Sequence, residues 1–357
     1  MRIVHAIGNL KGGGAETQLR YLAPELARRG HEVWVVHLRD DPTAWGETGS
    51  GVRFHRLGTP GTRHHSRRSW RNYDPRLPLR LIRLVRRTRS HVLQSWIVQM
   101  DILSAIAARF TGTKWVLREP SANFAHGGLK TRLRVRLAKG AAAIVANSKE
   151  GVRYWERTGS DARLIPNGVP LDRFDRAEAA PGDGRKRILF AGRLQPFKNV
   201  RLLAQAFAEV MRRRPGVVAE IAGDGPERAA VAETIAAAGG GVIMRGVVAD
   251  GAPYLKRADV FVSLSKLEGF PNTILEAMAC GRPIVASDIP QHRDILAAPW
   301  ARLVSPDRPE EAVAAILGTL DDPDWARNRE LARRRAGDFQ VQAMADRYER
   351  LYEELLA

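Results

Sequence analysis

Two glutamates with seven residues between them, Glu268 and Glu276, form the pattern most suggestive of chemistry in this sequence. Residues 260–264 are typical of a buried strand and residues 273–279 of a helix, so Glu268 is expected in the connecting loop and Glu276 early in the helix. A carboxylate there could hold two vicinal hydroxyl groups, as on a ribose. The backbone amides of residues 270–273 begin the helix and could hold an anion. The alternative is a pair of acids that only stabilises a helix N-terminus.

Two cations five residues apart, Arg193 and Lys198, form the second such pattern. They follow an apolar run at residues 187–190 and the turn-forming Gly192, and they precede a helix expected from about residue 200. A helix N-terminus adds unpaired N–H groups and the positive end of a dipole. The combination suits a diphosphate, and the alternative is a solvated loop with surface cations.

Both patterns follow strands, and the sequence predicts two series of such strands. A β-rich run at residues 2–7, three glycines at 12–14, a helical pattern at 16–29 and a strand at 31–38 predict a β-α-β unit. A similar series begins at residue 187, and further apolar strands are expected at 114–117, 142–146, 241–244, 260–264 and 283–286. Short apolar strands that alternate with helices predict doubly wound parallel sheets.

The expected fold class is therefore α/β, with two Rossmann-like domains facing a central cleft. The joint should lie near the turn-forming stretch 165–169, which gives an N-terminal domain over residues 1–168 and a C-terminal domain over residues 169–338. Ligands of open α/β sheets bind beyond the carboxyl ends of the strands. Residues 339–357 have helical periodicity and are expected either to cross back to the first domain or to pack on the second.

Four segments together resemble the retaining glycosyltransferases of family 4, which have the GT-B architecture. They are residues 12–16, the Gly192-Arg193 and Lys198-Asn199 pairs, residues 223–226, and residues 268–283 with their two glutamates. Their order and spacing also match, so the resemblance covers essentially the whole chain, and the last segment is the most specific.

The resemblance implies a role for each motif in binding a nucleotide-sugar donor. Arg193 and Lys198 would neutralise the diphosphate, Glu268 would contact the donor sugar near its anomeric end, and Glu276 would hold the ribose. The loop and helix start after Glu268 would bind the sugar and the distal phosphate, chiefly through amides: Gly269, Phe270, Pro271, Asn272 and Thr273. The nucleoside would be bordered by backbone at Gly223, Arg245, Gly246 and Val247, and the phosphates would be approached closely by the loop at Gly13 and Gly14.

The sequence departs from the family in the first domain. Many relatives have histidines near the donor sugar, whereas this chain has Gln94-Ser95-Trp96 at one such place and Arg118-Glu119-Pro120 at another. Arg118 and Glu119 are therefore candidates for catalytic residues that orient the acceptor or the sugar, and His126 is a third. The alternative for Arg118 and Glu119 is a local salt bridge at a strand end.

Charge is distributed unequally along the chain. The formal net charge is +18, from 57 Lys and Arg against 39 Asp and Glu, and residues 1–168 hold all of the excess. Twelve arginines and one acid lie between Arg53 and Arg89, and a second basic cluster runs from Lys130 to Lys139. Basic amphipathic helices suit an anionic membrane surface. The alternative is that these helices only cover the sheet and keep the protein soluble.

These features predict a retaining hexosyltransferase that uses a nucleotide-sugar, with UDP favoured, and a lipid-linked saccharide acceptor in cell-surface polysaccharide or glycoconjugate synthesis. A cytoplasmic protein attached peripherally to the inner membrane face is expected, since the first residues enter a strand rather than a secretory signal, no apolar run is long enough to span a bilayer, and a single cysteine fits a reducing compartment. No cofactor and no metal are expected. The alternatives are a soluble or acidic acceptor for the same enzyme class and, less favoured, a nucleic-acid-binding protein, since no nucleic-acid module is visible.

Overall fold

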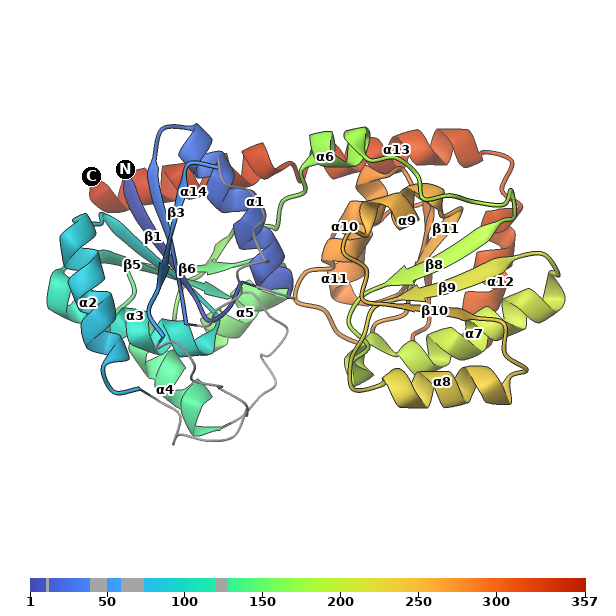
Figure 1. Ribbon diagram of the computed structural model, residues 1–357, viewed down its shortest axis with the longest axis horizontal. Helices are drawn as coiled ribbons and strands as arrows, with labels where there is room; N and C mark the ends of the chain where they lie inside the picture. The colour runs from blue at the N-terminus through green and yellow to red at the C-terminus, as the bar shows by residue number, and fades with distance from the viewer. Residues whose placement is uncertain (11–12, 39–49, 59–73, 120–127) are drawn as a thin grey trace. The chain divides into compact units, whose positions relative to one another are not determined.

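The computed structural model describes residues 1–10, 13–38, 50–58, 74–119 and 128–357 (Figure 1). The chain divides into two compact units, each described here by itself. Unit 1 consists of Met1–Gly168 and Val341–Ala357, and unit 2 consists of Val169–Gln340.

The described part of unit 1 holds a seven-stranded sheet in the order β3-β2-β1-β4-β5-β6-β7, and every pairing in it is parallel. The strands are β1 (Arg2–Ile7), β2 (Glu32–His37), β3 (Val52–Arg56), β4 (Val92–Trp96), β5 (Lys114–Glu119), β6 (Ala143–Ala146) and β7 (Arg163–Leu164). The helices of the unit are α1 (Gly14–Arg28), α2 (Leu77–Thr88), α3 (Val98–Thr111), α4 (Leu129–Ala138), α5 (Lys149–Arg157) and α14 (Val341–Leu356).

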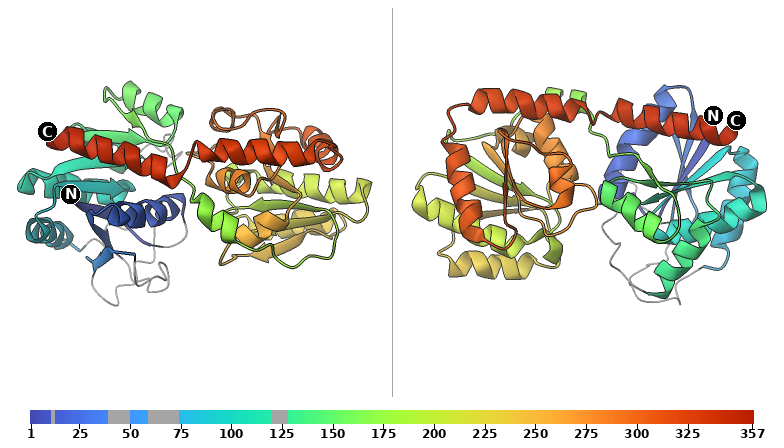
Figure 2. Two further views of the ribbon diagram at one scale, coloured as in Figure 1. Left: turned by 90° about the horizontal axis from the view of Figure 1, so that it is seen from above. Right: turned by 180° about the vertical axis from the view of Figure 1, so that it is seen from behind.

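Apolar side chains cover both faces of this sheet, which is why its central strands read as continuous hydrophobic runs. One face packs with α1 and α14, and the other packs with α2 and α3. Figure 2 shows α14 lying along unit 1 beside α1. The terminal segment was expected to begin at residue 339, but Phe339 stays in unit 2, where its ring packs edge-on against Phe270 with centroids 6.0 Å apart.

The described part of unit 2 holds a six-stranded parallel sheet in the order β10-β9-β8-β11-β12-β13. The strands are β8 (Arg187–Ala191), β9 (Val218–Ala222), β10 (Ile243–Gly246), β11 (Val260–Ser263), β12 (Ile284–Ser287) and β13 (Ala301–Val304). The helices are α6 (Leu171–Arg176), the 3₁₀ turn η3 (Pro196–Lys198), α7 (Val200–Arg213), α8 (Arg228–Ala237), α9 (Ala252–Arg257), α10 (Asn272–Ala279), α11 (Pro290–Arg293), α12 (Pro309–Leu320) and α13 (Trp325–Gly337).

Each unit is thus a doubly wound α/β domain, as the sequence predicts. In unit 2 the chain order reverses between β8 and β11, which are neighbours in the sheet. The carboxyl edge beside such a switch point is where open α/β sheets place ligands. The loops after β8 and β11 carry the two motifs that the sequence singles out.

Across the described ranges, no helix is both long enough and apolar enough to cross a membrane. Within the same ranges, no three or more His, Cys, Asp and Glu side chains gather as a metal site would require.

Candidate functional site

The loops after β8, β9 and β10 are joined by backbone hydrogen bonds at the carboxyl edge of unit 2. The Gly192 amide donates to the Ala222 carbonyl at 2.9 Å, and the Gly223 amide donates to the Gly246 carbonyl at 2.7 Å. A Cβ on Gly223 would lie 1.9 Å from the Gly192 carbonyl oxygen, and its φ of +138° also requires glycine. The predicted donor residues Gly223 and Gly246 therefore hold the edge together, whatever ligand they meet.

The loops after β8 and β11 bring the predicted diphosphate and sugar residues into contact. The Lys266 amide donates to the Phe197 carbonyl at 2.8 Å, which ties one loop to the other. Beside this tie, the Lys198 ammonium lies 2.5 Å from the Glu268 carboxylate. Glu268 is buried and Lys198 is mostly buried. Since burial strengthens such a contact, a diphosphate has to compete with Glu268 for the ammonium.

Arg193 and Glu276 lie close to this pair along the chain but differ in exposure. Arg193 is exposed in the loop after β8, so its guanidinium can meet an anion from solvent. Glu276 is the fifth residue of α10 and is half-buried. The structure therefore places Arg193, Lys198, Glu268 and Glu276 on loops and a helix that follow neighbouring strands.

The start of α10 carries the predicted donor-binding amides. In this structure the Asn272 amide donates to the Phe270 carbonyl at 3.0 Å. Phe270 packs its ring on the core of unit 2, and Pro271 precedes the helix without a side-chain cap. Gly269 is buried and Thr273 is half-buried beside them.

In unit 1, the glycine segment precedes α1. Gly13 is in extended backbone directly before the helix, with no side-chain cap, and Gly14 is its first residue. A Cβ on Gly13 would lie 2.2 Å from a Glu16 carboxylate oxygen, which can rotate away. Gly12 and His126 lie outside the described residues. So do residues 59–73 of the basic stretch between Arg53 and Arg89.

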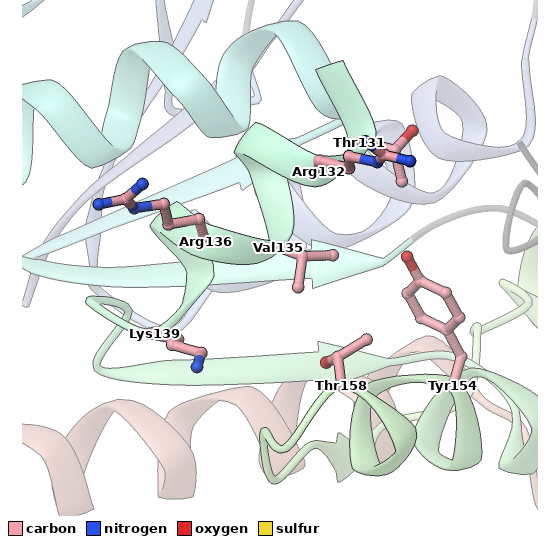
Figure 3. A pocket seen from close by; sticks show the side chains of 7 residues that line it. All are labelled: Thr131, Arg132, Val135, Arg136, Lys139, Tyr154 and Thr158. Atoms are coloured by element: carbon pink, nitrogen blue, oxygen red, sulfur yellow. The ribbon is translucent and has the colours of Figure 1, made fainter. Parts of the chain in front are cut away.

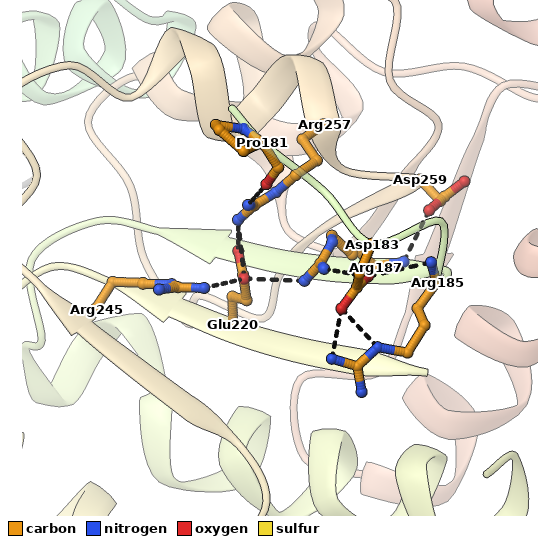
Figure 4. Close-up of polar contacts among 8 residues, drawn as sticks. All are labelled: Pro181, Asp183, Arg185, Arg187, Glu220, Arg245, Arg257 and Asp259. Carbon is orange, nitrogen blue, oxygen red and sulfur yellow. Dashed lines mark hydrogen bonds and ion pairs between the residues drawn. The ribbon is translucent and has the colours of Figure 1, made fainter. Parts of the chain in front are cut away.

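The Arg245 side chain serves a structural network in unit 2 (Figure 4). It donates to Glu220 on β9 at 2.7 Å, and the same carboxylate also accepts from Arg187 at 3.2 Å and from Arg257 at 2.7 Å. Glu220 is 2% exposed, so three guanidinium groups meet one buried carboxylate. The neighbouring Val247, whose backbone was predicted to border the nucleoside, is 77% exposed.

Arg118, a predicted catalytic candidate, lies inside unit 1 and contacts the terminal helix. It is wholly buried, and its Nε donates to the Tyr348 hydroxyl at 2.9 Å while its Nη2 donates to Asn167. Its guanidinium also lies over the Trp96 ring, 4.2 Å from the centroid. Because Tyr348 belongs to α14, these contacts fasten the terminal helix to the sheet.

Glu119 is likewise buried in unit 1, and its ion-pair partner is Arg134 rather than Arg118. Successive residues of a strand point to opposite faces, so the two side chains leave β5 in opposite directions. Glu119 accepts from Arg134 of α4, whose Nε also donates to Asp101 at 2.6 Å. Both acids are buried, and burial raises the pKa of the Asp101 carboxyl against the lowering effect of Arg134. Arg134 is therefore absent from the surface where the basic cluster was expected.

The structure also brings forward a residue that sequence reasoning missed. His292 of α11 is wholly buried after β12, and its Nδ1 lies 2.7 Å from the Ser287 carbonyl oxygen. The desolvation of burial lowers its pKa, while the nearby Glu268 carboxylate raises it and Lys198 lowers it. A lone histidine carries no spacing signal, and only its place after a predicted strand could have singled it out.

A hollow of about 650 Å³ lies in unit 1 between α4 and α5 (Figure 3). It is lined by Thr131, Arg132, Val135, Arg136, Lys139, Tyr154 and Thr158. Among the described residues, no carboxylate pairs with Arg132, Arg136 or Lys139. Leu129, which begins α4, is 73% exposed. The hollow thus combines unneutralised cations with a nearby exposed apolar side chain.

Comparison with known families covers both units. A family model described as Glycosyltransferase Family 4 matches residues 12–173, and one described as Glycosyl transferases group 1 matches residues 185–322. A phosphatidyl-myo-inositol mannosyltransferase of Mycolicibacterium smegmatis is 36% identical over 180 residues, which are 48% of this chain and 46% of that protein. An alpha-monoglucosyldiacylglycerol synthase of Streptococcus pneumoniae is 31% identical over 156 residues, 38% of this chain and 34% of that protein. The matched part of the chain thus spans about half or less of the length of these curated relatives.

Solved structures share the fold over nearly the whole chain. HepE of Anabaena in complex with UDP and glucose has a TM-score of 0.85 at 20% identity, covering 99% of both chains. Sucrose-phosphate synthase of Thermosynechococcus elongatus has a TM-score of 0.80 at 21% identity, also covering 99% of both chains.

Proposed function

Since this chain belongs to the glycosyltransferases of family 4, we propose that it is a hexosyltransferase that moves a hexose or N-acetylhexosamine from a nucleotide-sugar to an acceptor, with retention of the anomeric configuration. The observation that carries the proposal is the contact of Lys198 with Glu268 at the switch point of unit 2. It joins the residue expected at the diphosphate to the residue expected at the sugar.

The chemistry of the donor fits these residues. Cleavage of a sugar–phosphate bond builds negative charge on the leaving diphosphate, and preorganised cations lower the barrier. Arg193 and Lys198 would supply the positive charge that neutralises the diphosphate, so we propose a reaction that needs no metal or cofactor. Glu276 would hold the ribose, and UDP is the favoured nucleotide because HepE has been solved with UDP.

We further propose a lipid-linked acceptor at the cytoplasmic membrane face. Two observations support it: the names of the curated relatives, which act on phosphatidyl-myo-inositol or make a glucosyldiacylglycerol, and the unneutralised cations beside the hollow of unit 1. The role in cell-surface polysaccharide or glycoconjugate synthesis follows from such an acceptor. A soluble acceptor is the alternative within the same enzyme class.

Incubation of the protein with UDP-, GDP- and ADP-sugars labelled in the sugar, together with a membrane lipid extract, tests the proposal. Label is expected in the organic phase with one donor, and NMR of the product should show the anomeric configuration of the donor. Transfer only to water-soluble acceptors would contradict the lipid-linked acceptor, and inversion would contradict the retaining mechanism.

A further inference from the structure

His292 presents a buried hydrogen-bond acceptor without a partner. Its Nδ1 lies 2.7 Å from the Ser287 carbonyl oxygen and 3.3 Å from the Ser287 hydroxyl. A carbonyl oxygen only accepts hydrogen bonds, so Nδ1 carries the ring proton and Nε2 carries a lone pair. The side chain is wholly buried, and no described residue donates to Nε2.

The position of His292 in the sheet places it at the candidate donor site. It follows β12, which pairs in parallel with β11, and the loop after β11 carries Glu268. The Ser287 hydroxyl donates to the Ser265 carbonyl, which joins these two loops. The Glu268 carboxylate raises the pKa of His292 and the Lys198 ammonium lowers it, as expected for charges on the neighbouring loops.

The charge state of the His292 ring determines which ligand groups can form a hydrogen bond with Nε2. Burial lowers the pKa of His292, opposed by the Glu268 carboxylate and, more weakly, by Asp288, while Lys198 lowers it further. Asp288 is itself paired with Arg293. A neutral Nε2 accepts from an O–H or N–H group and gains nothing from a diphosphate, whose oxygens carry no proton at neutral pH. Buried acceptors in native proteins are almost always paired, so an unpaired one calls for a ligand or a water.

We infer that His292 is a specificity-determining residue of the donor site, whose Nε2 accepts a hydrogen bond from a hydroxyl group of the sugar that Glu268 contacts. The inference rests on the proposed function and extends it from the diphosphate to the sugar. It assigns His292 to the sugar part of the donor alone.

Two substitutions separate the two ring nitrogens. In His292→Asn the amide can still donate to the Ser287 carbonyl, but the acceptor at Nε2 is lost. In His292→Gln the longer side chain can place its amide oxygen where Nε2 was. Calorimetry should compare a nucleoside diphosphate with its nucleotide-sugar, using UDP with UDP-glucose and GDP with GDP-mannose.

His292→Asn is expected to lower the affinity for the nucleotide-sugar by about tenfold, the usual effect of losing one buried hydrogen bond. The affinity for the nucleoside diphosphate should stay unchanged. His292→Gln should restore part of the loss. Nucleotide-sugars that each lack one sugar hydroxyl group identify the hydroxyl that His292 contacts. The analogue that lacks this hydroxyl should bind to wild type and to His292→Asn with the same affinity. His5→Asn, the same change at a buried histidine of unit 1, is the matched control and should leave both affinities unchanged.

Equal affinities of wild type and His292→Asn for the nucleotide-sugar would overturn the inference and indicate a buried water at Nε2. Equal weakening of both ligands would also overturn it, because a structural role affects the whole site. Wild-type protein that binds neither ligand pair, nor ADP and its ADP-sugar, would contradict the proposed function itself and the inference with it.

Discussion

At the scale of single residues, the proposed donor site implies a competition for Lys198. Its ammonium lies 2.5 Å from Glu268, and both side chains are largely shielded from water. If a diphosphate binds as proposed, it would replace Glu268 as the anionic partner of Lys198, and Glu268 would then accept hydrogen bonds from the sugar hydroxyl groups. Diphosphate binding and sugar contact would thus be coupled through this pair.

Glu268→Gln separates the two roles. The variant should bind a nucleoside diphosphate at least as tightly as wild type, because Lys198 no longer pairs with a carboxylate, whereas sugar transfer should fall by about 100-fold or more. Calorimetry with UDP or GDP and a transfer assay measure the two effects. Lys198→Ala is the matched comparison and should lower the affinity for the nucleoside diphosphate. Equal loss of diphosphate affinity in both variants would contradict the competition.

His5 makes the stability of unit 1 dependent on pH. Burial, assisted by the charge of Arg118, lowers the pKa of His5 from 6.5 to about 3 in the folded protein. Below pH 6.5 the unfolded chain binds a proton that the folded chain excludes, so stability falls as the pH drops from 6.5 towards 3, by up to about 1.4 kcal/mol per pH unit.

His5→Asn keeps an acceptor for the Trp96 indole, which lies 3.3 Å from Nδ1, and removes the titrating group. Urea unfolding of both proteins at pH 7.0 and 5.5 should show that wild type loses about 1 kcal/mol more than the variant over this interval. The same loss in both proteins would mean that His5 does not set the dependence.

Sequence reasoning named candidate site residues but not their partners. Arg118 and Glu119 were expected either to orient a substrate or to form a local salt bridge with each other. Instead Arg118 contacts Tyr348 of α14, 230 residues away, and Glu119 contacts Arg134 of α4, 15 residues away. The contact of Lys198 with Glu268 spans 70 residues. Neither short-range spacing nor periodicity reports such contacts.

At the scale of elements, the strands with continuous apolar runs were predicted, including the edge strand β10 at residues 241–244, whereas the edge strands β3 and β13 were not. Residues 114–117, 260–264 and 283–286 were expected as strands and correspond to β5, β11 and β12. In contrast, β3 and β13 lie at sheet edges and carry exposed or charged residues, so no continuous apolar run marks them.

The Glu220 network predicts a large effect of one charge on unit 2. Glu220→Gln should lower its free energy of unfolding by about 3 kcal/mol, because three guanidinium groups then share no buried counter-charge. Glu209→Gln is the matched control: Glu209 pairs with Arg212 and Arg213 on the exposed surface of α7 and should change stability by less than about 1 kcal/mol. Urea unfolding of the full chain measures both, and similar small effects would show that the network is not stabilising.

At the scale of the whole molecule, the charge excess is confined to residues 1–168, whereas the remainder of the chain balances its charges. Exposed arginines of unit 2 such as Arg212 and Arg213 have carboxylate partners. In unit 1, Arg132, Arg136 and Lys139 have none among the described residues. The sequence predicted the asymmetry, but only the structure shows that Arg134 is withdrawn from the cluster into a buried ion pair.

The proposed membrane attachment rests on this asymmetry and can be measured by sedimentation with vesicles. The full chain should bind vesicles with 30% phosphatidylglycerol and release them as salt is raised, since surface attraction is screened. Replacement of Arg132, Arg136 and Lys139 by serine should reduce binding by about 100-fold, at about 1 kcal/mol for each cation. Replacement of Arg212 and Arg213 should have little effect, and equal losses in the two variants would contradict attachment through α4.

The central claim is that the carboxyl edge of unit 2 binds and activates a nucleotide-sugar. The most direct test is the release of nucleoside diphosphate from UDP-, GDP- and ADP-sugars by the wild type, Lys198→Ala and Glu276→Ala. We expect release from one donor by the wild type and rates at least about 100-fold lower in each variant. Near-normal rates in both variants would contradict the assignment of the donor site.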